Sequence, residues 1–266
     1  MNLTIYQADA FTDKLFGGNP AAVCPLQEWL PDELMQQIAL ENNLSETAFI
    51  VPDGTDYAIR WFTPTVEVDL CGHATLATAH ICFTELKHPE KKIVFQSKSG
   101  PLTVRQSIHG YTMDFPIDPI QAVDIPLKMV EALGGVTPIA TFKGSTDYMV
   151  LLDSQQTLEQ LVPNYGVMAS IPARGIIVTA KGEKVDIVSR FFCPQSGIDE
   201  DPVTGSAHTT LIPFWSKKLD KTILIAQQFS QRGGILFCEL KQKRVLISGN
   251  AVTYMKGSIL VEDSTK

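Results

Sequence analysis

Residues 60–80 read RWFTPTVEVDLCGHATLATAH, and residues 190–211 read RFFCPQSGIDEDPVTGSAHTTL. Both stretches open with arginine, phenylalanine two residues later and proline two residues after that, at an offset of 130 (190 − 60). Each continues through an acidic segment to a glycine, Gly72 or Gly205, and these glycines are 133 residues apart (205 − 72), which a three-residue insertion explains. The recurrence predicts an internal duplication with two similar halves.

The segment after Gly72 is predicted to form a buried helix. Its apolar residues cover nearly the whole helical circumference, which is typical of a helix without a solvent-facing side. They are Ala74, Leu76, Ala77, Ala79, Ile81, Cys82, Phe83 and Leu86. Short strand-like runs such as TAFIVP, KIVFQS and GIIVTA surround it in the sequence. We therefore expect an α+β chain in which each half wraps a sheet around a central helix.

The duplication also predicts the domain boundaries. A linker near Pro116–Pro126 would separate an N-terminal domain, residues 1–118, from a C-terminal domain, residues 119–266. This division leaves open that the last strand of the chain pairs within the first domain. Two central helices would then have their N-termini available to face one cleft.

Composition narrows the class of protein. A chain of 266 residues, 44% hydrophobic and 19% charged, is typical of a globular protein in aqueous solution. A formal net charge of −7 argues against a general affinity for nucleic acid. The start has no signal-peptide pattern, and no apolar run approaches the roughly 20 residues that span a bilayer. Five cysteines without a CxxC pair indicate reduced thiols, so we expect a cytoplasmic protein without membrane partners.

Gly72 and Gly205 stand at two predicted helix starts. Glycine lets a ligand approach the backbone, and the free N–H groups and dipole of a helix start attract anions. Two such starts would clamp a small carboxylic acid, although glycines also serve tight turns. The acidic segment before Gly205 ends in Asp201-Pro202, which is typical of a helix start with Asp as the cap. The alternative is that Asp201 forms a polar wall with Ser206, opposite His73.

His73 and Glu46 are candidate acid/base groups. At a helix N-terminus the positive potential disfavours imidazolium, so His73 would be a neutral proton relay, or simply a hydrogen-bonded structural residue. Glu46 lies where the chain leaves a helix and enters the apolar strand TAFIV. Desolvation there would raise the pKa of its carboxyl group and make it a better general base, whereas an ordinary solvated glutamate is the alternative.

Other site classes have no support in the sequence. There is no GxGxxG at a strand-to-helix turn and no GxxxxGK[ST], so we expect no nucleotide cofactor. The five histidines show neither HExxH nor a ligand spacing with cysteine, so we expect no metal. A GxSxG nucleophile motif is also absent.

Four motifs in order resemble the PhzF-like (phenazine-biosynthesis) isomerase family. They are YQADAFTDKLFGGNPAAVC, NLSETAFI, RWFTPTVEVDLCGHATLA and GIDEDPVTGSAH, and the similarity runs from the first strand to the end of the chain. The family is similar in fold to diaminopimelate epimerase, with two pseudo-symmetric halves, each a β-barrel-like sheet around a central helix. The resemblance implies a cofactor-independent isomerase that moves a proton on a small carboxylate-bearing metabolite in the cleft between the halves. It also suggests a homodimer.

The resemblance implies a role for each matched residue. Glu46 matches the essential general acid/base, and His73, Asp201 and Ser206 match residues that assist proton transfer or hold the substrate. The backbone amides near the two helix starts would hold the carboxylate and stabilise developing negative charge. The substrate-binding residues implied in this way are Asn19 with its neighbour Gly18, Cys71, Gly72, Thr204 and Gly205.

Cys71 carries the competing enzyme hypothesis. The epimerase relatives use two cysteines, one in each half, and Cys71 occupies the first of these positions. Its counterpart falls at or near Pro202, which cannot move a proton, so a two-thiol racemase is excluded in this register. A single-cysteine epimerase or racemase stays open, since a helix N-terminus would lower the pKa of the Cys71 thiol. A non-catalytic small-molecule-binding protein on the same scaffold is the third hypothesis.

Overall fold

The computed structural model describes residues 1–261, and the chain divides into two compact units. The first unit comprises Met1–Asp114 and the chain from Ser248 onward, and the second comprises Phe115–Ile247. The boundary found after Asp114 lies four residues (118 − 114) before the one expected from the sequence, and the last strand belongs to the first unit. Among the described helices, none combines the length and the apolar character that a bilayer crossing requires.

The first unit is a continuous sheet built around one helix. Strand pairing gives the order β18-β1-β2-β3-β4-β6-β7-β8, in which β2–β3 and β4–β6 are parallel and the other pairs are antiparallel. The short β5 pairs with β4. The strands are β1 Asn2–Ala10, β2 Asn19–Pro25, β3 Glu46–Asp53, β4 Asp56–Phe62, β5 Glu67–Val68, β6 Lys92–Ser97, β7 Gly100–Ser107, β8 Gly110–Pro116 and β18 Ala251–Leu260. β8 and β17, Arg244–Gly249, each include residues of both units.

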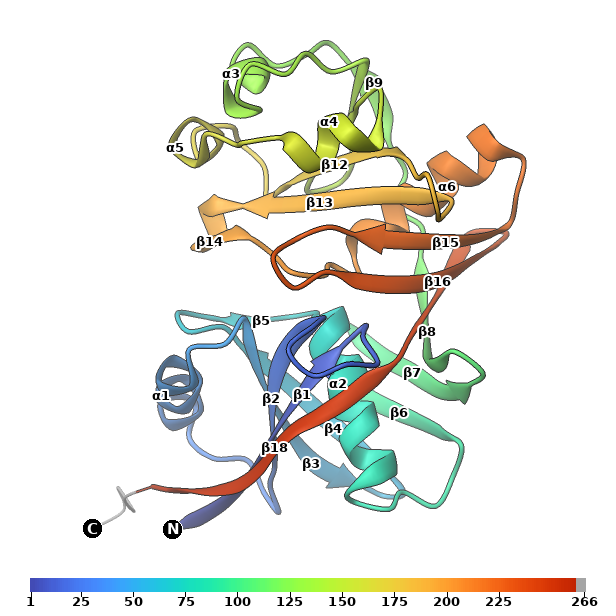
Figure 1. Cartoon of the computed structure of the whole chain (residues 1–266). Helices are drawn as coiled ribbons and strands as arrows, with labels where there is room; N and C mark the ends of the chain where they lie inside the picture. The colour runs from blue at the N-terminus through green and yellow to red at the C-terminus, as the bar shows by residue number, and fades with distance from the viewer. Residues whose placement is uncertain (262–266) are drawn as a thin grey trace. The chain divides into compact units, whose positions relative to one another are not determined.

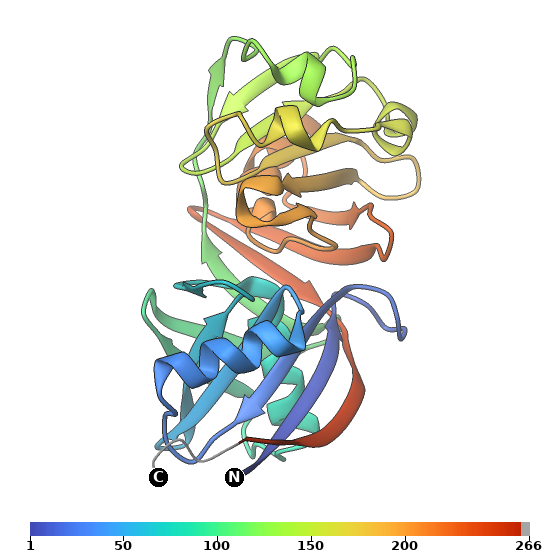
Figure 2. The same ribbon diagram turned by 90° about the vertical axis from the view of Figure 1, so that its left-hand side faces the viewer.

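The helix α2, Gly72–Thr84, forms the core of the first unit. Every residue from His73 to Phe83 is buried, which confirms the helix expected from the apolar circumference. It packs against β1, β2, β3 and β18, and Figure 1 shows it inside the curve of these strands. The second helix of this unit, α1 Asp32–Asn42, packs against β3 and β4 and crosses the outer side of the sheet in Figure 2.

The second unit repeats this plan. Its order is β9-β10-β11-β12-β13-β15-β16, with β11–β12 and β13–β15 parallel, and the short β14 pairs with β13. The strands are β9 Gln121–Val123, β10 Ala140–Lys143, β11 Tyr148–Leu151, β12 Ile176–Lys181, β13 Ile187–Cys193, β14 Ile198–Glu200, β15 Ile223–Gln228 and β16 Gly234–Lys241. The helices are α3 Met129–Ala132, α4 Gln155–Gln160, α5 Tyr165–Met168 and α6 Ala207–Leu219, with a 3₁₀ turn at Pro194–Ser196.

The two units therefore share one topology, as the sequence repeat predicts. In each, a parallel pair is followed by an antiparallel hairpin, a short strand, a buried helix and a second parallel pair. The repeated arginines also make the same contact. Arg60 forms a two-pronged ion pair with Glu67, and Arg190 forms one with Glu200. The predicted class, two pseudo-symmetric α+β halves around central helices, is confirmed.

Strand pairing fixes the register between the halves. Phe62 lies opposite Glu67, and Phe192 lies opposite Glu200, so the second connection is three residues longer (8 against 5). The 3₁₀ turn and Gly197, whose φ is +82°, lie in this longer connection. Glu200 thus corresponds to Glu67, and the same offset makes Thr204 the counterpart of Cys71. The counterpart was expected at or near Pro202; the strand register places it two residues later, where Thr204 carries a hydroxyl group.

The predicted helix start at Asp201-Pro202 is wrong. α6 begins at Ala207, with Ser206 as its N-cap residue, while α2 begins at Gly72 as expected. The segment 201–206 forms a turn in which the Asp201 carboxylate accepts a hydrogen bond from the Thr204 hydroxyl rather than capping a helix. An aspartate side chain can satisfy either role, so local sequence did not distinguish them.

Candidate active site

Glu46 and His73 lie in direct contact in the first unit. Glu46 is the first residue of β3, as expected, and His73 is the second residue of α2. The His73 Nε2 atom is 3.0 Å from Oε2 of Glu46, with 6% and 15% of the two side chains exposed. Neither atom has a well-aligned hydrogen-bond partner among the described residues.

The thiol of Cys71 completes this cluster. Cys71 is the N-cap residue of α2, and its Sγ atom lies 3.6 Å from Nδ1 of His73. Its carbonyl oxygen accepts a hydrogen bond from the backbone N–H of Thr75, at 3.2 Å, and another from the Thr75 hydroxyl. The imidazole ring thus stands between a thiol and a carboxylate, with one ring nitrogen turned to each.

The charges in this cluster differ from those expected of an isolated helix start. Burial, together with the negative charge on Glu46, raises the pKa of the Cys71 thiol to about 11. The thiol is therefore protonated at neutral pH, and the expectation of a lowered pKa was wrong, because burial outweighs the potential of the helix end.

The expected charge of His73 is also corrected. Burial disfavours its imidazolium form, but the charges of Cys71 and Glu46 outweigh burial and raise the pKa of His73 well above its usual value. This direction is opposite to the one expected from the helix dipole, because the charges of the two neighbouring groups favour the imidazolium form.

The ligand atoms of Glu46, Cys71 and His73 lie within 4.8 Å of one another, so a metal site has to be considered. His73 turns Nδ1 toward Cys71 and Nε2 toward Glu46. An ion bound to one ring nitrogen would have only one of the other two ligands on its side of the ring. The donor set fits proton transfer better than it fits a metal.

Asp201 and Thr204 lie together in the second unit. Asp201 is buried, and its carboxylate accepts the hydroxyl proton of Thr204 in a hydrogen bond. The amide of Gln228 holds this turn: its Nε2 donates to the Asp201 carbonyl at 2.8 Å, and its Oε1 accepts from the Thr204 N–H at 2.8 Å. Gln228 is fully buried at the end of β15. The network fixes the orientation of both predicted side chains.

Ser206 contacts a charged pair that sequence reasoning missed. Its Oγ atom accepts hydrogen bonds from Nη1 and Nη2 of Arg174, both at 3.3 Å. Arg174 in turn donates from Nε to Oδ1 of Asp147 at 2.9 Å, and from Nη2 to Oδ2. Asp147 and Arg174 are 27 residues apart, and Ser206 follows 32 residues later. Its place in the repeat is the sequence signal that could have indicated Arg174. It precedes Gly175, the residue of the second unit that corresponds to Glu46 by strand pairing.

The remaining predicted residues lie at the ends of elements. Asn19 is the buried first residue of β2, Gly72 is the first residue of α2, and Gly205 lies two residues before α6. Gly18 has φ +62°, and a Cβ atom there would lie 2.1 Å from the Ala10 carbonyl oxygen. Only glycine fits this turn without displacing the backbone.

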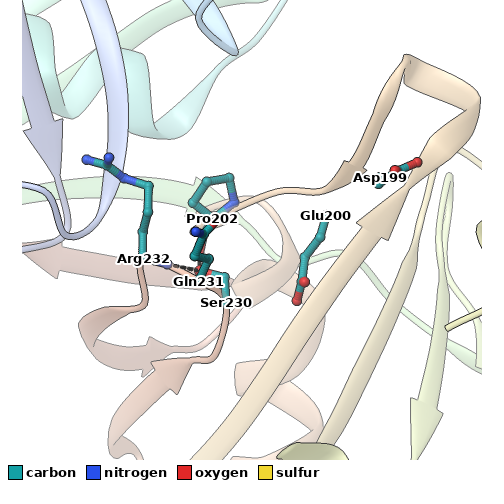
Figure 3. A pocket seen from close by; sticks show the side chains of 6 residues that line it. All are labelled: Asp199, Glu200, Pro202, Ser230, Gln231 and Arg232. Atoms are coloured by element: carbon teal, nitrogen blue, oxygen red, sulfur yellow. Dashed lines mark hydrogen bonds between the residues drawn. The ribbon is translucent and has the colours of Figure 1, made fainter. Parts of the chain in front are cut away.

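The second unit has a hollow of about 290 Å³, and its lining includes Glu200 and Pro202, the two sequence neighbours of Asp201. Figure 3 shows Pro202 between the acidic side chains of β14 and the turn that joins β15 to β16. The Ser230 hydroxyl donates to the Pro202 carbonyl at 3.0 Å, which ties the two walls together. The lining residues are Asp199, Glu200, Pro202, Ser230, Gln231 and Arg232.

Comparison with known proteins places the chain in a family. Residues 8–257 match the family model described as phenazine biosynthesis-like protein. An uncharacterized isomerase of Pseudomonas aeruginosa is 49% identical over 97% of this chain and 99% of its own length. The crystal structure of a PhzF-family phenazine biosynthesis protein from Enterococcus faecalis is 45% identical, with a TM-score of 0.95 over 98% of this chain and 100% of that one.

A more distant structure shows the wider fold. A hydroxyproline epimerase from Agrobacterium vitis has a TM-score of 0.63 at 11% identity, over 99% of this chain and 94% of its own. At this identity the likeness concerns the fold alone. The duplicated fold, the ordered motifs and the full-length match together show that this chain belongs to the PhzF-like isomerase family, on the diaminopimelate epimerase-like fold.

Proposed function

We propose that this isomerase moves a proton between carbon atoms of a small carboxylate-bearing metabolite, with Glu46 as the general acid/base and without a cofactor. The contact between Glu46 and His73 is the observation that carries the proposal. The two reactive atoms are 3.0 Å apart, nearly buried and without aligned partners among the described residues. A buried acid/base pair of this kind is more typical of an active site than of a module that only binds.

The same contact supports an assignment for the first step. The contact of 3.0 Å with Nε2 of His73 holds the Glu46 side chain in place, and we assign Glu46 to accept a proton from a substrate carbon. The electron pair of the broken C–H bond passes into the adjoining unsaturated system or carbonyl group, and Glu46 becomes a carboxylic acid. Return of that proton to another carbon restores the carboxylate and completes an isomerisation without net change in atoms. His73 offers positive charge near the developing anion throughout.

The family motifs are the basis for the roles that we give to Asp201, Ser206 and the substrate-binding residues. Asp201 is held by Thr204 and Gln228, and Ser206 by Arg174, so both side chains are oriented before substrate binds. Orientation in advance lowers the cost of forming the reactive complex. We assign Asp201 to assisting proton transfer and Ser206 to holding the substrate.

Deuterium incorporation tests this function. Metabolite extracts are incubated with the protein in heavy water, and mass spectrometry identifies compounds that gain deuterium at carbon. The Glu46→Gln variant is expected to lower the rate at least about a hundredfold, the size of a lost general base. Glu85→Gln, which changes a carboxylate on the α2 C-cap residue, is the matched control and is expected to keep the wild-type rate. Undiminished exchange in Glu46→Gln contradicts the role of Glu46.

A further inference from the structure

Arg174 is a charged residue in the second unit whose side chain has a fixed orientation. Its backbone N–H donates to the Thr146 carbonyl at 2.9 Å, and its guanidinium binds Asp147 through two hydrogen bonds. The Asp147 side chain is 3% exposed, whereas that of Arg174 is 42% exposed. A buried carboxylate that grips one edge of a guanidinium leaves the other edge directed at a defined place.

The repeat shows what place this is. Thr47 pairs with Phe62 as Ile176 pairs with Phe192, so Gly175 is the counterpart of Glu46. A Cβ atom on Gly175 would lie 2.3 Å from Cζ of Phe191, so a side chain at this position would collide with the ring. The guanidinium of Arg174 lies 5.4 Å from the centroid of the same ring. The first unit thus has the carboxylate of Glu46 at this position. The second unit has Gly175, and the residue before it, Arg174, carries a positive charge.

Ser206 is the counterpart of His73, by the same offset that matches Gly72 with Gly205. Both Nη atoms of Arg174 donate to its Oγ atom at 3.3 Å. A hydroxyl group has one proton and two lone pairs, and these two N–H groups occupy the lone-pair side. The Ser206 proton must then point away from Arg174, and the nearby positive charge makes it a stronger donor.

We propose that Arg174, held by Asp147, is a positioning residue that makes Ser206 a hydrogen-bond donor to a substrate carboxylate at the head of α6. The proposal deepens the proposed function, because it rests on a carboxylate-bearing substrate and says what recognises that group. Asp147 balances the charge of Arg174, so recognition depends on the directed hydroxyl proton rather than on net positive charge. Arg174 acts through Ser206 and needs no contact with the reacting atoms.

The test uses benzoate as the carboxylate probe and benzamide as its uncharged counterpart. Backbone amide signals of residues 205–209 are followed by NMR in the full-length ¹⁵N-labelled protein during titration. Benzoate is expected to shift these signals, and benzamide to bind at least about tenfold more weakly. Ser206→Ala and Arg174→Met are each expected to weaken benzoate binding about tenfold. Absence of benzoate binding at these amides overturns the proposal.

A double-mutant cycle separates positioning from general structural support. If Arg174 acts through Ser206, the double variant binds benzoate no more weakly than Ser206→Ala alone. Losses that multiply show that Arg174 acts independently, which overturns the proposal. If Arg174→Met does not fold, Arg174→Lys decides: wild-type affinity there contradicts the proposal, since lysine lacks the paired N–H groups, whereas a loss of at least about threefold supports it.

This result is distinct from that of the deuterium experiment. Benzoate binding that depends on Arg174 supports the inference even if no compound gains deuterium, which would refute only the proposed isomerisation. The opposite result is also possible. If deuterium exchange depends on Glu46 but the losses of benzoate affinity in the Arg174 and Ser206 variants multiply, the proposed function stands and the positioning role is refuted. Where a substrate is found, Arg174→Met is expected to raise KM more than it lowers kcat, in contrast to Glu46→Gln.

Discussion

At the level of single residues, Glu46 contributes to the raised pKa of His73. The Glu46→Gln variant removes one of the two neighbouring charges that raise the pKa of His73, while the burial that lowers this pKa remains. We expect the pKa of His73 to fall in this variant. NMR titration of the imidazole signals measures it, and Glu85→Gln, remote from this contact, should leave the pKa unchanged. An unchanged pKa in Glu46→Gln would show that Glu46 is not the cause of the shift.

The same contact makes stability depend on pH. A pKa raised in the folded state adds stability that is complete below the unfolded pKa, about 6.5, and is lost as pH rises through the folded value. The free energy of unfolding of the wild type should therefore exceed that of Glu46→Gln most at about pH 6. The difference should shrink toward alkaline pH. Urea unfolding at a series of pH values gives this curve, and a difference that grows with pH would contradict it.

Cys71 is predicted to be chemically quiet. Its thiol is buried and has a pKa of about 11, so little thiolate exists at pH 7.5. Iodoacetamide should leave Cys71 unmodified in the folded protein and modify it in urea, as peptide mass spectrometry can show. Cys71→Ser should keep the Glu46-dependent deuterium exchange. Rapid alkylation of Cys71 with parallel loss of exchange would favour the single-cysteine epimerase instead.

Among the elements, the turn between β1 and β2 depends on Gly18. Gly18→Ala combines a positive φ with a Cβ atom 2.1 Å from the Ala10 carbonyl oxygen, so the backbone must move. Gly54→Ala is the matched control, since it has a similar φ, +65°, with no atom within 4 Å. We expect a loss of about 1 kcal/mol for Gly54→Ala and at least about 3 kcal/mol for Gly18→Ala in urea unfolding. Equal losses would show that the close approach is relieved at little cost.

The elements also show what the sequence could predict. The repeat and the apolar helix after Gly72 predicted the topology, because burial and strand pairing follow local patterns. The start of α6 could not be read in the same way, since Asp201 fits a cap and a turn equally well. Contacts across the fold were out of reach: Arg174 meets Ser206 only through the register of several strands. The raised pKa of His73 likewise depends partly on Glu46, 27 residues earlier (73 − 46).

At the scale of the whole molecule, the two units differ in how the chain builds them. The second unit is one continuous stretch, whereas the first needs the C-terminal strand. β18 pairs with β1 from Asn2 opposite Leu260 to Ala10 opposite Ala251, and α2 packs against it. A chain shortened to residues 1–250 should therefore lose the structure of the first unit, including the Glu46–His73 contact, and retain that of the second.

Hydrogen exchange followed by mass spectrometry measures this difference, with a chain of residues 1–261 as the reference. Amides of β1, β2 and α2 should exchange at least about tenfold faster after truncation, because the lost pairing exposes the edge of β1 and one side of the buried helix. Amides of β12, β13 and α6 should keep their protection, since the strands that β12 and β13 pair with, and the strands β15 and β16 that α6 packs against, lie within residues 115–247. Equal acceleration in both units would show that they unfold as one cooperative body. Unchanged exchange in the first unit would show that β18 is dispensable for its core.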